Sequence, residues 1–199
     1  LHVDRGSPLV AVNLWYHVGS KDEAPGRTSF AHLFEHLMFM GSKNAPYPSF
    51  DAIMESWDGH NNGTTSNDRT NYYEIGPRNL LETFLWLEAD RLATLPDVIT
   101  NEELERQLKV VQNERRQSYE NRPYGKAQLL VPDALYPATH PYHWPVIGSH
   151  QDLEAAKVED VREFFRRFYV PSNASIVIAG DFDPATARAA EPSLVVDDT

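Results

Sequence analysis

Residues 32–41 read HLFEHLMFMG and place two histidines and a glutamate inside a run of Leu, Phe and Met. On a helix, His32 and His36 are four residues apart and project from one face. Glu35 lies beside them on the same side. Burying three ionisable groups together is costly unless a counter-charge is present. The stretch therefore predicts a helix with a functional site on one side.

Metal binding is the chemistry that this spacing favours. Two neutral imidazoles one helical turn apart can bind one zinc ion, and a catalytic zinc usually takes three protein ligands and leaves one position for water. Glu35 is better placed to accept a proton from that water than to bind the metal. The order H-x-x-E-H, the reverse of H-E-x-x-H, marks the inverzincins. The alternative is that both histidines are hydrogen-bonded core residues and that Glu35 faces solvent.

The composition narrows the remaining possibilities. The 199 residues suffice for one sizeable domain with a core, and 41% of them are hydrophobic. A formal net charge of −11 argues against a nucleic-acid or anionic-membrane surface. The absence of cysteine excludes disulfides, cysteine zinc sites and thiol nucleophiles. No apolar run approaches the roughly 18 residues of a membrane-spanning helix.

The distribution of strands and helices predicts the fold class. Residues 9–18 are rich in β-branched and aromatic side chains and predict a strand. Thr28 or Ser29 can cap the helix of the opening motif, and Gly41 can end it. The other expected elements are a helix at 49–57, two strands within 58–75 around a turn near Asn67, helices at 80–95 and 102–121, a Pro-rich loop at 136–148, a helix at 158–168, a strand at 174–179, a further helix from 184, and a tail at 191–199. Strands mixed with long helices, without regular alternation, indicate an α+β fold.

A third metal ligand is expected on a helix that packs near the first one. The long charged helix has an apolar stripe at Leu104, Leu108 and Val111, and Glu114 lies at the edge of this stripe. A carboxylate near a buried face needs a cation, which zinc would supply. The alternative is a surface ion pair between Glu114 and a neighbouring arginine. The residues alone leave both interpretations open.

Several motifs, taken in order, resemble the pitrilysin-like metallopeptidases (family M16), which include insulin-degrading enzyme and the mitochondrial processing peptidase. The motifs are HLFEHLMF at 32–39, GHNNGTTSNDRTNYY at 59–73, VVQNERR at 110–116, HPYHWPVIG at 140–148 and FYVPSNASIVIAGDFDP at 168–184. The resemblance covers nearly the whole chain. It implies an α+β domain of the metallopeptidase (LuxS/MPP-like) type, in which helices cover a mixed β-sheet.

The resemblance also implies roles for individual residues. His32, His36 and Glu114 would bind one zinc ion per chain, and Glu35 would be the general base that activates the zinc-bound water. Gln107 occupies a position where many family members have a second glutamate that supports the zinc site from outside. Gln107 can still form a hydrogen bond but carries no charge, so the tuning of the zinc would differ. The implied activity is that of a zinc endopeptidase acting on peptides or unfolded protein segments.

Substrate is expected to bind as an added strand along a sheet edge. The family places this edge in the strand that follows the zinc helix, which here contains Asn62, Gly63 and Thr64. Asn62 is the main candidate for contact with the substrate backbone. The alternative for Asn62 is a turn residue that bonds to its own backbone.

Family peptidases combine two or four homologous domains into a clamshell that encloses the substrate. Residues 1–199 are therefore expected to form a single N-terminal zinc-binding domain of a longer or paired protein, with a homologous second M16 domain as partner. Relatives of this type are often exported, which favours a bacterial periplasmic or secreted location. Two alternatives remain: a non-catalytic scaffolding subunit of an M16 heteromer, and a module whose zinc is structural. A closed site with four protein ligands would favour the second alternative.

Overall fold

The computed structural model describes residues 1–190, and the expected tail at 191–199 lies outside the described residues. The strands are β1 (His2–Val3), β2 (Leu9–Tyr16), β3 (His60–Thr65), β4 (Thr70–Pro77) and β5 (Ala174–Gly180). The α-helices are α1 (Phe30–Leu37), α2 (Ser49–Ser56), α3 (Leu81–Val98), α4 (Asn101–Arg115), α5 (Gly125–Leu135), α6 (His150–Ala155), α7 (Val158–Phe168) and α8 (Pro184–Ala190).

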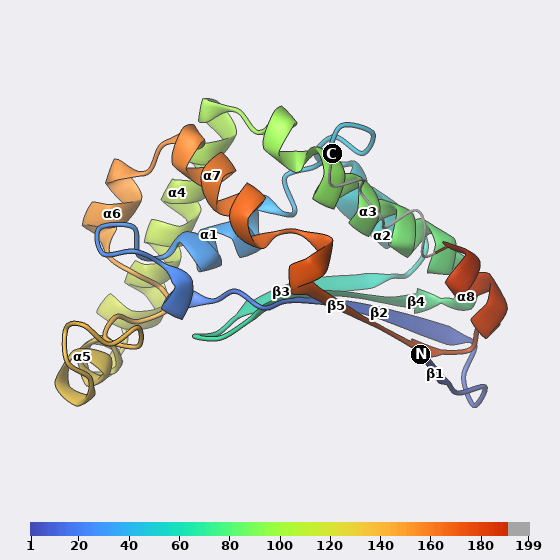
Figure 1. Cartoon of the computed structure of the whole chain (residues 1–199), viewed down its shortest axis with the longest axis horizontal. Helices are drawn as coiled ribbons and strands as arrows, with labels where there is room; N and C mark the ends of the chain where they lie inside the picture. The colour runs from blue at the N-terminus through green and yellow to red at the C-terminus, as the bar shows by residue number, and fades with distance from the viewer. Residues whose placement is uncertain (191–199) are drawn as a thin grey trace.

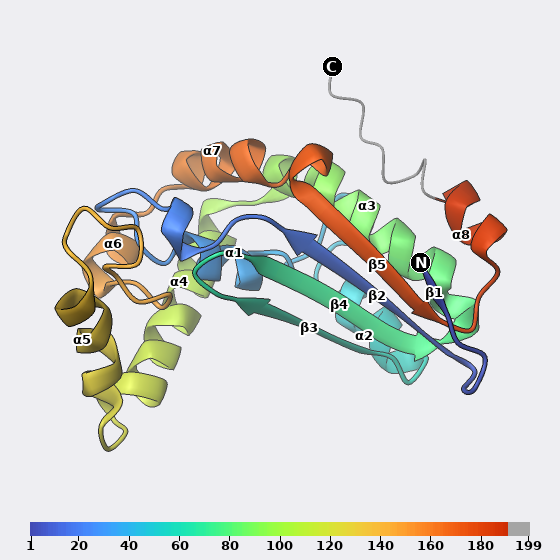
Figure 2. The ribbon, with the colours of Figure 1, turned by 60° about the horizontal axis from the view of Figure 1, so that its bottom comes forward.

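The strands form one mixed sheet in the order β1-β5-β2-β4-β3. β1 runs parallel to β5, and the other neighbours are antiparallel. Figures 1 and 2 show α1, α2 and α3 on one face of the sheet and α7 outside α1 and α3, while α5 stands apart at one end. The α+β class with a helix-covered mixed sheet is thus confirmed.

The alternation of side chains along β2 explains why helices cover one face only. Val10, Val12, Leu14 and Tyr16 are buried, whereas Trp15 and its neighbours of odd number point to the other face. Antiparallel sheets often pack one face on a core and leave the other open. Within the described residues, the exposed apolar side chains of the open face are Leu9, Trp15, Ile75 and Val177.

The core between sheet and helices has two parts. One part joins α1, α4 and α7 to the middle of the sheet through residues such as Phe34, Val111 and Phe165. The other lies under α2 and α3 and includes Phe50 and Phe84. Helix α1 packs its apolar side into the first cluster, whereas its two histidines face α4 and Glu35 faces β3.

Some elements differ from the expected ones. Helix α3 continues through Pro96 to Val98, and the long charged helix ends at Arg115 and passes into a π-helical turn, Arg116–Glu120. Strand β1 and helices α5 and α6 were not predicted. β1 has two residues, which is too short to show any alternation, and α5 contains Gly125 and Pro132, which weaken a helical pattern.

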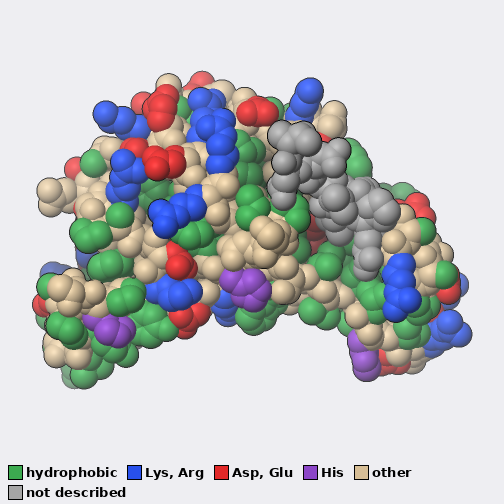
Figure 3. All heavy atoms as spheres, viewed as in Figure 1, with side chains coloured by type: hydrophobic (Ala, Val, Ile, Leu, Met, Phe, Trp, Pro, Cys, Tyr) green, Lys and Arg blue, Asp and Glu red, His purple; other side chains and the backbone are tan. Residues whose placement is uncertain are grey.

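Among residues 1–190, no helix is both long enough and apolar enough to cross a membrane. Figure 3 shows Lys and Arg side chains interspersed with Asp and Glu over the helical face. Such a mixture is typical of a solvated surface rather than of a basic binding patch.

A buried arginine ties helix α3 to strand β4. Nε of Arg91 donates to Glu88 at 2.8 Å and Nη2 donates to Glu74 at 3.2 Å, and all three side chains are almost completely buried. The guanidinium also lies over the rings of Phe50 and Tyr72, at 5.0 and 4.8 Å. Burial and the nearby Glu88 raise the pKa of Glu74 well above its usual value. Arg91 is thus the counter-ion on which two buried carboxyl groups depend.

We expect the substitution Arg91→Met to lower the free energy of unfolding by about 3–5 kcal/mol, because it leaves buried carboxyl groups without a partner. Urea unfolding followed by circular dichroism measures this loss. The matched control is Arg78→Met, since Arg78 pairs with Asp181 while its side chain is 63% exposed. That pair should contribute less than about 1 kcal/mol. Equal losses in the two variants would contradict the role assigned to Arg91.

Candidate metal centre

Buried acceptors hold the start of helix α1. The carboxylate of Glu23 accepts hydrogen bonds from the backbone N–H groups of Ser29 at 3.1 Å and Ala31 at 2.9 Å. Burial raises the pKa of Glu23, and these two amides act in the opposite direction. Asp152 accepts from both the N–H and the hydroxyl of Thr28, at 2.9 and 2.6 Å. The N–H groups of Thr28, Ser29 and Ala31, just before and within the first turn of α1, are therefore bonded to acidic side chains, which also suit the helix dipole.

The end of helix α1 is held by a third carboxylate. Asp90, on α3, accepts hydrogen bonds from the hydroxyl of Ser42 and from the N–H and side-chain amide of Asn44, the latter two at 3.0 and 2.5 Å. The chain turns at Gly41, whose φ is +94°. A Cβ there would lie 2.3 Å from the backbone nitrogen of Tyr47, so only glycine fits.

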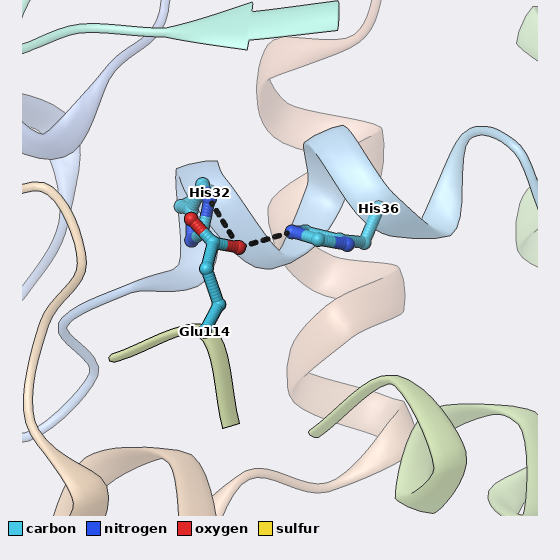
Figure 4. Close-up of side chains that lie close together, drawn as sticks. All are labelled: His32, His36 and Glu114. Atoms are coloured by element: carbon cyan, nitrogen blue, oxygen red, sulfur yellow. Dashed lines mark ion pairs between the residues drawn. The ribbon is translucent and has the colours of Figure 1, made fainter. Parts of the chain in front are cut away.

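The three predicted ligands lie together, as Figure 4 shows. Nε2 of His32 is 3.6 Å and Nε2 of His36 is 3.2 Å from the same Oε2 atom of Glu114. The two imidazole rings are nearly perpendicular, with centroids 4.9 Å apart. Their proximity follows from the four-residue spacing on α1, whereas Glu114 arrives from the last turn of α4.

The electrostatics of the cluster favour neutral imidazole beside ionised carboxylate. Burial lowers the pKa of His32 to about 4, although Glu114 acts in the opposite direction. The hydrogen bond from His36 lowers the pKa of Glu114, and burial opposes this shift. Neutral imidazole and ionised carboxylate are the forms that bind metals.

This donor set fits a zinc ion. Two histidine nitrogens and one glutamate oxygen form a common set of ligands for catalytic zinc. The ligand atoms of a tetrahedral zinc site lie about 3.4 Å apart, given zinc–ligand bonds of about 2.0–2.1 Å. One donor atom from each of the three residues lies within 4.8 Å of the other two. His32 is buried, while His36 and Glu114 are partly exposed, so the cluster is open on one side.

Glu35 lies next to this cluster and against strand β3. Its Oε2 accepts a hydrogen bond from the hydroxyl of Thr65 at 2.6 Å. A Cβ on Gly63 would lie 2.9 Å from Cγ of Glu35, so glycine makes room for the glutamate. Burial raises the pKa of Glu35, and the hydrogen bond from Thr65 acts against this shift. Glu35 is thus half-buried and is held by β3.

A pocket of about 370 Å³ adjoins the cluster. It is lined by His32, Glu35, Gly63, Thr64, Thr65, Glu114, Tyr119, Val146 and Ile147. Sequence reasoning missed Tyr119, which lies in the π-helical turn after α4, and Val146 and Ile147, which come from the Pro-rich loop. A loop has no periodicity that would assign its apolar residues to a pocket.

The expected substrate residues occupy the sheet edge at this pocket. Gly63 faces Glu35, and the Thr64 hydroxyl bonds to Asn71 at 2.5 Å. Asn62 is exposed, and its Oδ1 accepts a hydrogen bond from the N–H of Gly63 at 2.8 Å. Asn62 thus bonds to the adjacent backbone from within β3 rather than from a turn, and its contact with substrate stays a prediction.

Gln107 lies farther along α4 and is buried. Its amide nitrogen is 2.7 Å from the sulfur of Met40, just beyond the end of α1. This contact ties α4 to the chain that leaves the zinc helix. An effect of Gln107 on the metal itself stays a prediction.

Two family models and several zinc proteases match the sequence of this chain. Residues 2–142 match the family model described as insulinase (peptidase family M16), and residues 155–191 match the model of the peptidase M16 inactive domain. A zinc protease named PqqE from Helicobacter pylori is 32% identical over 173 residues, which cover 87% of this chain and 38% of that protein. An uncharacterised zinc protease, YmxG, from Bacillus subtilis is 27% identical over 92% of this chain and 44% of its own length.

Solved structures share the fold. The crystal structure of a protease from Helicobacter pylori superposes with a TM-score of 0.89 at 30% identity, over 95% of this chain and 45% of that one. The periplasmic protease PqqL from Escherichia coli shares the fold with a TM-score of 0.84 at 22% identity, over 98% of this chain and 22% of its own. The chain therefore spans less than half the length of these relatives. By its family match over residues 2–142, the chain belongs to peptidase family M16, the insulinase family.

Proposed function

We propose that this chain is the zinc-binding domain of an M16 peptidase that hydrolyses peptides or unfolded protein segments. The observation that carries the proposal is the convergence of His32, His36 and Glu114 beside a pocket that Glu35 lines. The zinc protease names of the relatives support the choice of metal. One zinc ion per chain would be held by the Nε2 atoms of the histidines and the carboxylate of Glu114.

The zinc ion and Glu35 would then have separate chemical roles. A bound zinc ion would polarise the scissile carbonyl and make water at the site more acidic. Glu35 accepts the proton of the attacking water and returns it to the leaving amine, as a general base and then a general acid. Partial burial raises the pKa of Glu35, which brings it closer to neutral pH and suits both tasks.

The free edge of β3 is the proposed binding site for the substrate backbone. β3 is the outermost strand, and Ser66 N–H donates to the carbonyl of Arg69 at the end of the hairpin. Because residues in an antiparallel ladder alternate, the main-chain groups of Gly63 and Thr65 point away from β4. An extended peptide that pairs with them would lie beside Glu35. Asn62 must first release the N–H of Gly63.

A homologous second M16 domain is the proposed partner. The chain matches 38–44% of the length of two curated relatives, so those proteins contain more than this domain. The domain also presents a sheet face with exposed apolar side chains. A second domain would enclose the peptide that the β3 edge binds.

We expect Glu35→Gln to retain zinc and to lose peptide hydrolysis by about 10²–10⁴-fold, because the general base is removed while the ligands remain. Zinc content is measured by elemental analysis and hydrolysis with a flexible fluorogenic peptide, in the full-length protein. Glu105→Gln, at an exposed position of α4, is the matched control and should keep both properties.

Two outcomes would contradict the proposal. Full activity of Glu35→Gln would exclude Glu35 as the base. Zinc bound by the parent protein without any hydrolysis would favour the scaffolding subunit.

His36→Ala should abolish zinc binding, since it removes one of three ligands.

In the metal-free protein, His32 should lower the stability of the fold as the pH falls. His32 has a pKa near 4 in the folded protein and about 6.5 when unfolded, so the unfolded chain binds the extra proton between these values. The contribution of His32 to the free energy of unfolding should therefore fall by about 1–2 kcal/mol from pH 7 to pH 5, whereas the raised pKa values of Glu23, Glu35 and Glu74 act in the opposite direction. Urea unfolding with a chelator present measures this change. Between these pH values the stability of the parent should change by about 1–2 kcal/mol less favourably than that of His32→Gln, whereas His2→Gln, at an exposed position, should follow the parent. Identical changes in the parent and His32→Gln would contradict the assignment.

A further inference from the structure

Thr65 makes the one hydrogen bond to the Glu35 carboxylate that the described residues provide. Its hydroxyl lies 2.6 Å from Oε2. An ionised carboxylate only accepts hydrogen bonds, so Thr65 is the donor. The hydroxyl occupies Oε2 and leaves Oε1 as the oxygen available to a proton from water.

The local structure fixes the direction of this hydroxyl. Thr65 is the last residue of β3 and pairs with Thr70 of β4. A β-branched side chain on a strand has few χ1 rotamers, so little entropy is lost when its hydroxyl is held in one place. Two residues earlier, Gly63 leaves the space that the Glu35 side chain fills. Strand β3 therefore accommodates the Glu35 side chain in two ways: Thr65 donates a hydrogen bond to it, and Gly63 leaves space for it.

The charged groups around Glu35 do not replace this contact. His36 and Glu114 belong to the proposed metal cluster. Nη1 of Arg69 donates to the carbonyl of Thr64 at 3.0 Å and to Oδ1 of Asn71 at 2.5 Å. Arg69 thus acts on Glu35 through space only, whereas Thr65 can orient it.

We propose that Thr65 is a positioning residue for the general base, holding the Glu35 carboxylate so that its second oxygen faces the pocket. The inference rests on the function proposed above, in which Glu35 transfers the proton. A general base contributes only when it lies within hydrogen-bond reach of its proton. Without the hydroxyl, the carboxylate would keep its place on α1 but lose its fixed orientation.

The first test needs no catalysis. In the metal-free, full-length protein, the stabilities of the parent, Thr65→Val, Glu35→Ala and the double variant form a double-mutant cycle. Thr65→Val should lower the urea midpoint when Glu35 is present and leave it nearly unchanged in the Glu35→Ala background. Equal shifts in both backgrounds would show that the two side chains do not interact, and would overturn the proposal.

The second test measures peptide hydrolysis with zinc bound. Thr65→Val should lower kcat by about 10–100-fold, a part of the 10²–10⁴-fold effect of a general base, with KM and zinc content nearly unchanged. Thr65→Ser keeps the donor and should restore kcat to within about threefold of the parent. The matched control is Thr186→Val, which removes a hydroxyl that donates to Asp183 at 3.0 Å on the remote helix α8. It should leave kcat unchanged.

The outcomes separate the two proposals. A kcat for Thr65→Val within twofold of the parent, or a Thr65→Ser variant as slow as Thr65→Val, would overturn the positioning role while the peptidase stands. A parent protein that hydrolyses no peptide would overturn the proposed function, and the double-mutant cycle would still decide whether Thr65 holds Glu35.

Discussion

The metal cluster depends on how helix α1 is held at its two ends. This helix has eight residues, too few to be stable by itself in water. Glu23 bonds its first N–H groups, and Asp90 bonds the chain just beyond its end. Leu33, Phe34 and Leu37 are buried in between. Hydrophobic packing sets the face of the helix, and the buried carboxylates set where it starts and stops.

Several charged side chains are buried in the domain, and different kinds of contact stabilise them. Arg91 is the positively charged partner of Glu74 and Glu88. Backbone N–H groups donate hydrogen bonds to the carboxyl group of Glu23. His32 and Glu114 support one another through opposite preferences for the proton. A divalent ion between them would replace one weak contact by metal–ligand bonds. Arg91 and Glu74 come from different elements, as do His32 and Glu114, so these contacts form only when the helices and the sheet have packed together.

The parts of the fold with a clear period were predictable from the sequence. The opening helix, the β3–β4 hairpin and the strand at 174–179 lie where the pattern placed them, within a few residues. The spacing of His32 and His36 also predicted their proximity. The position of Glu114 beside the histidines depends on how α1 and α4 pack together, which the sequence pattern does not specify. The apolar stripe of α4 therefore left Glu114 open to two interpretations, a metal ligand or a surface ion pair. Thr65 gave no signal, because one hydroxyl at the end of a strand has no distinctive spacing.

The contact between Asn62 and Gly63 affects how the edge of β3 meets other strands. An outermost strand presents unsatisfied main-chain donors, which invite identical strands from other molecules to associate. Oδ1 of Asn62 satisfies one such donor in the middle of β3. A strand from a second copy of the chain would have to displace this side chain to reach the N–H of Gly63. The Asn62 side chain therefore reduces the number of free main-chain donors that this edge offers to another strand.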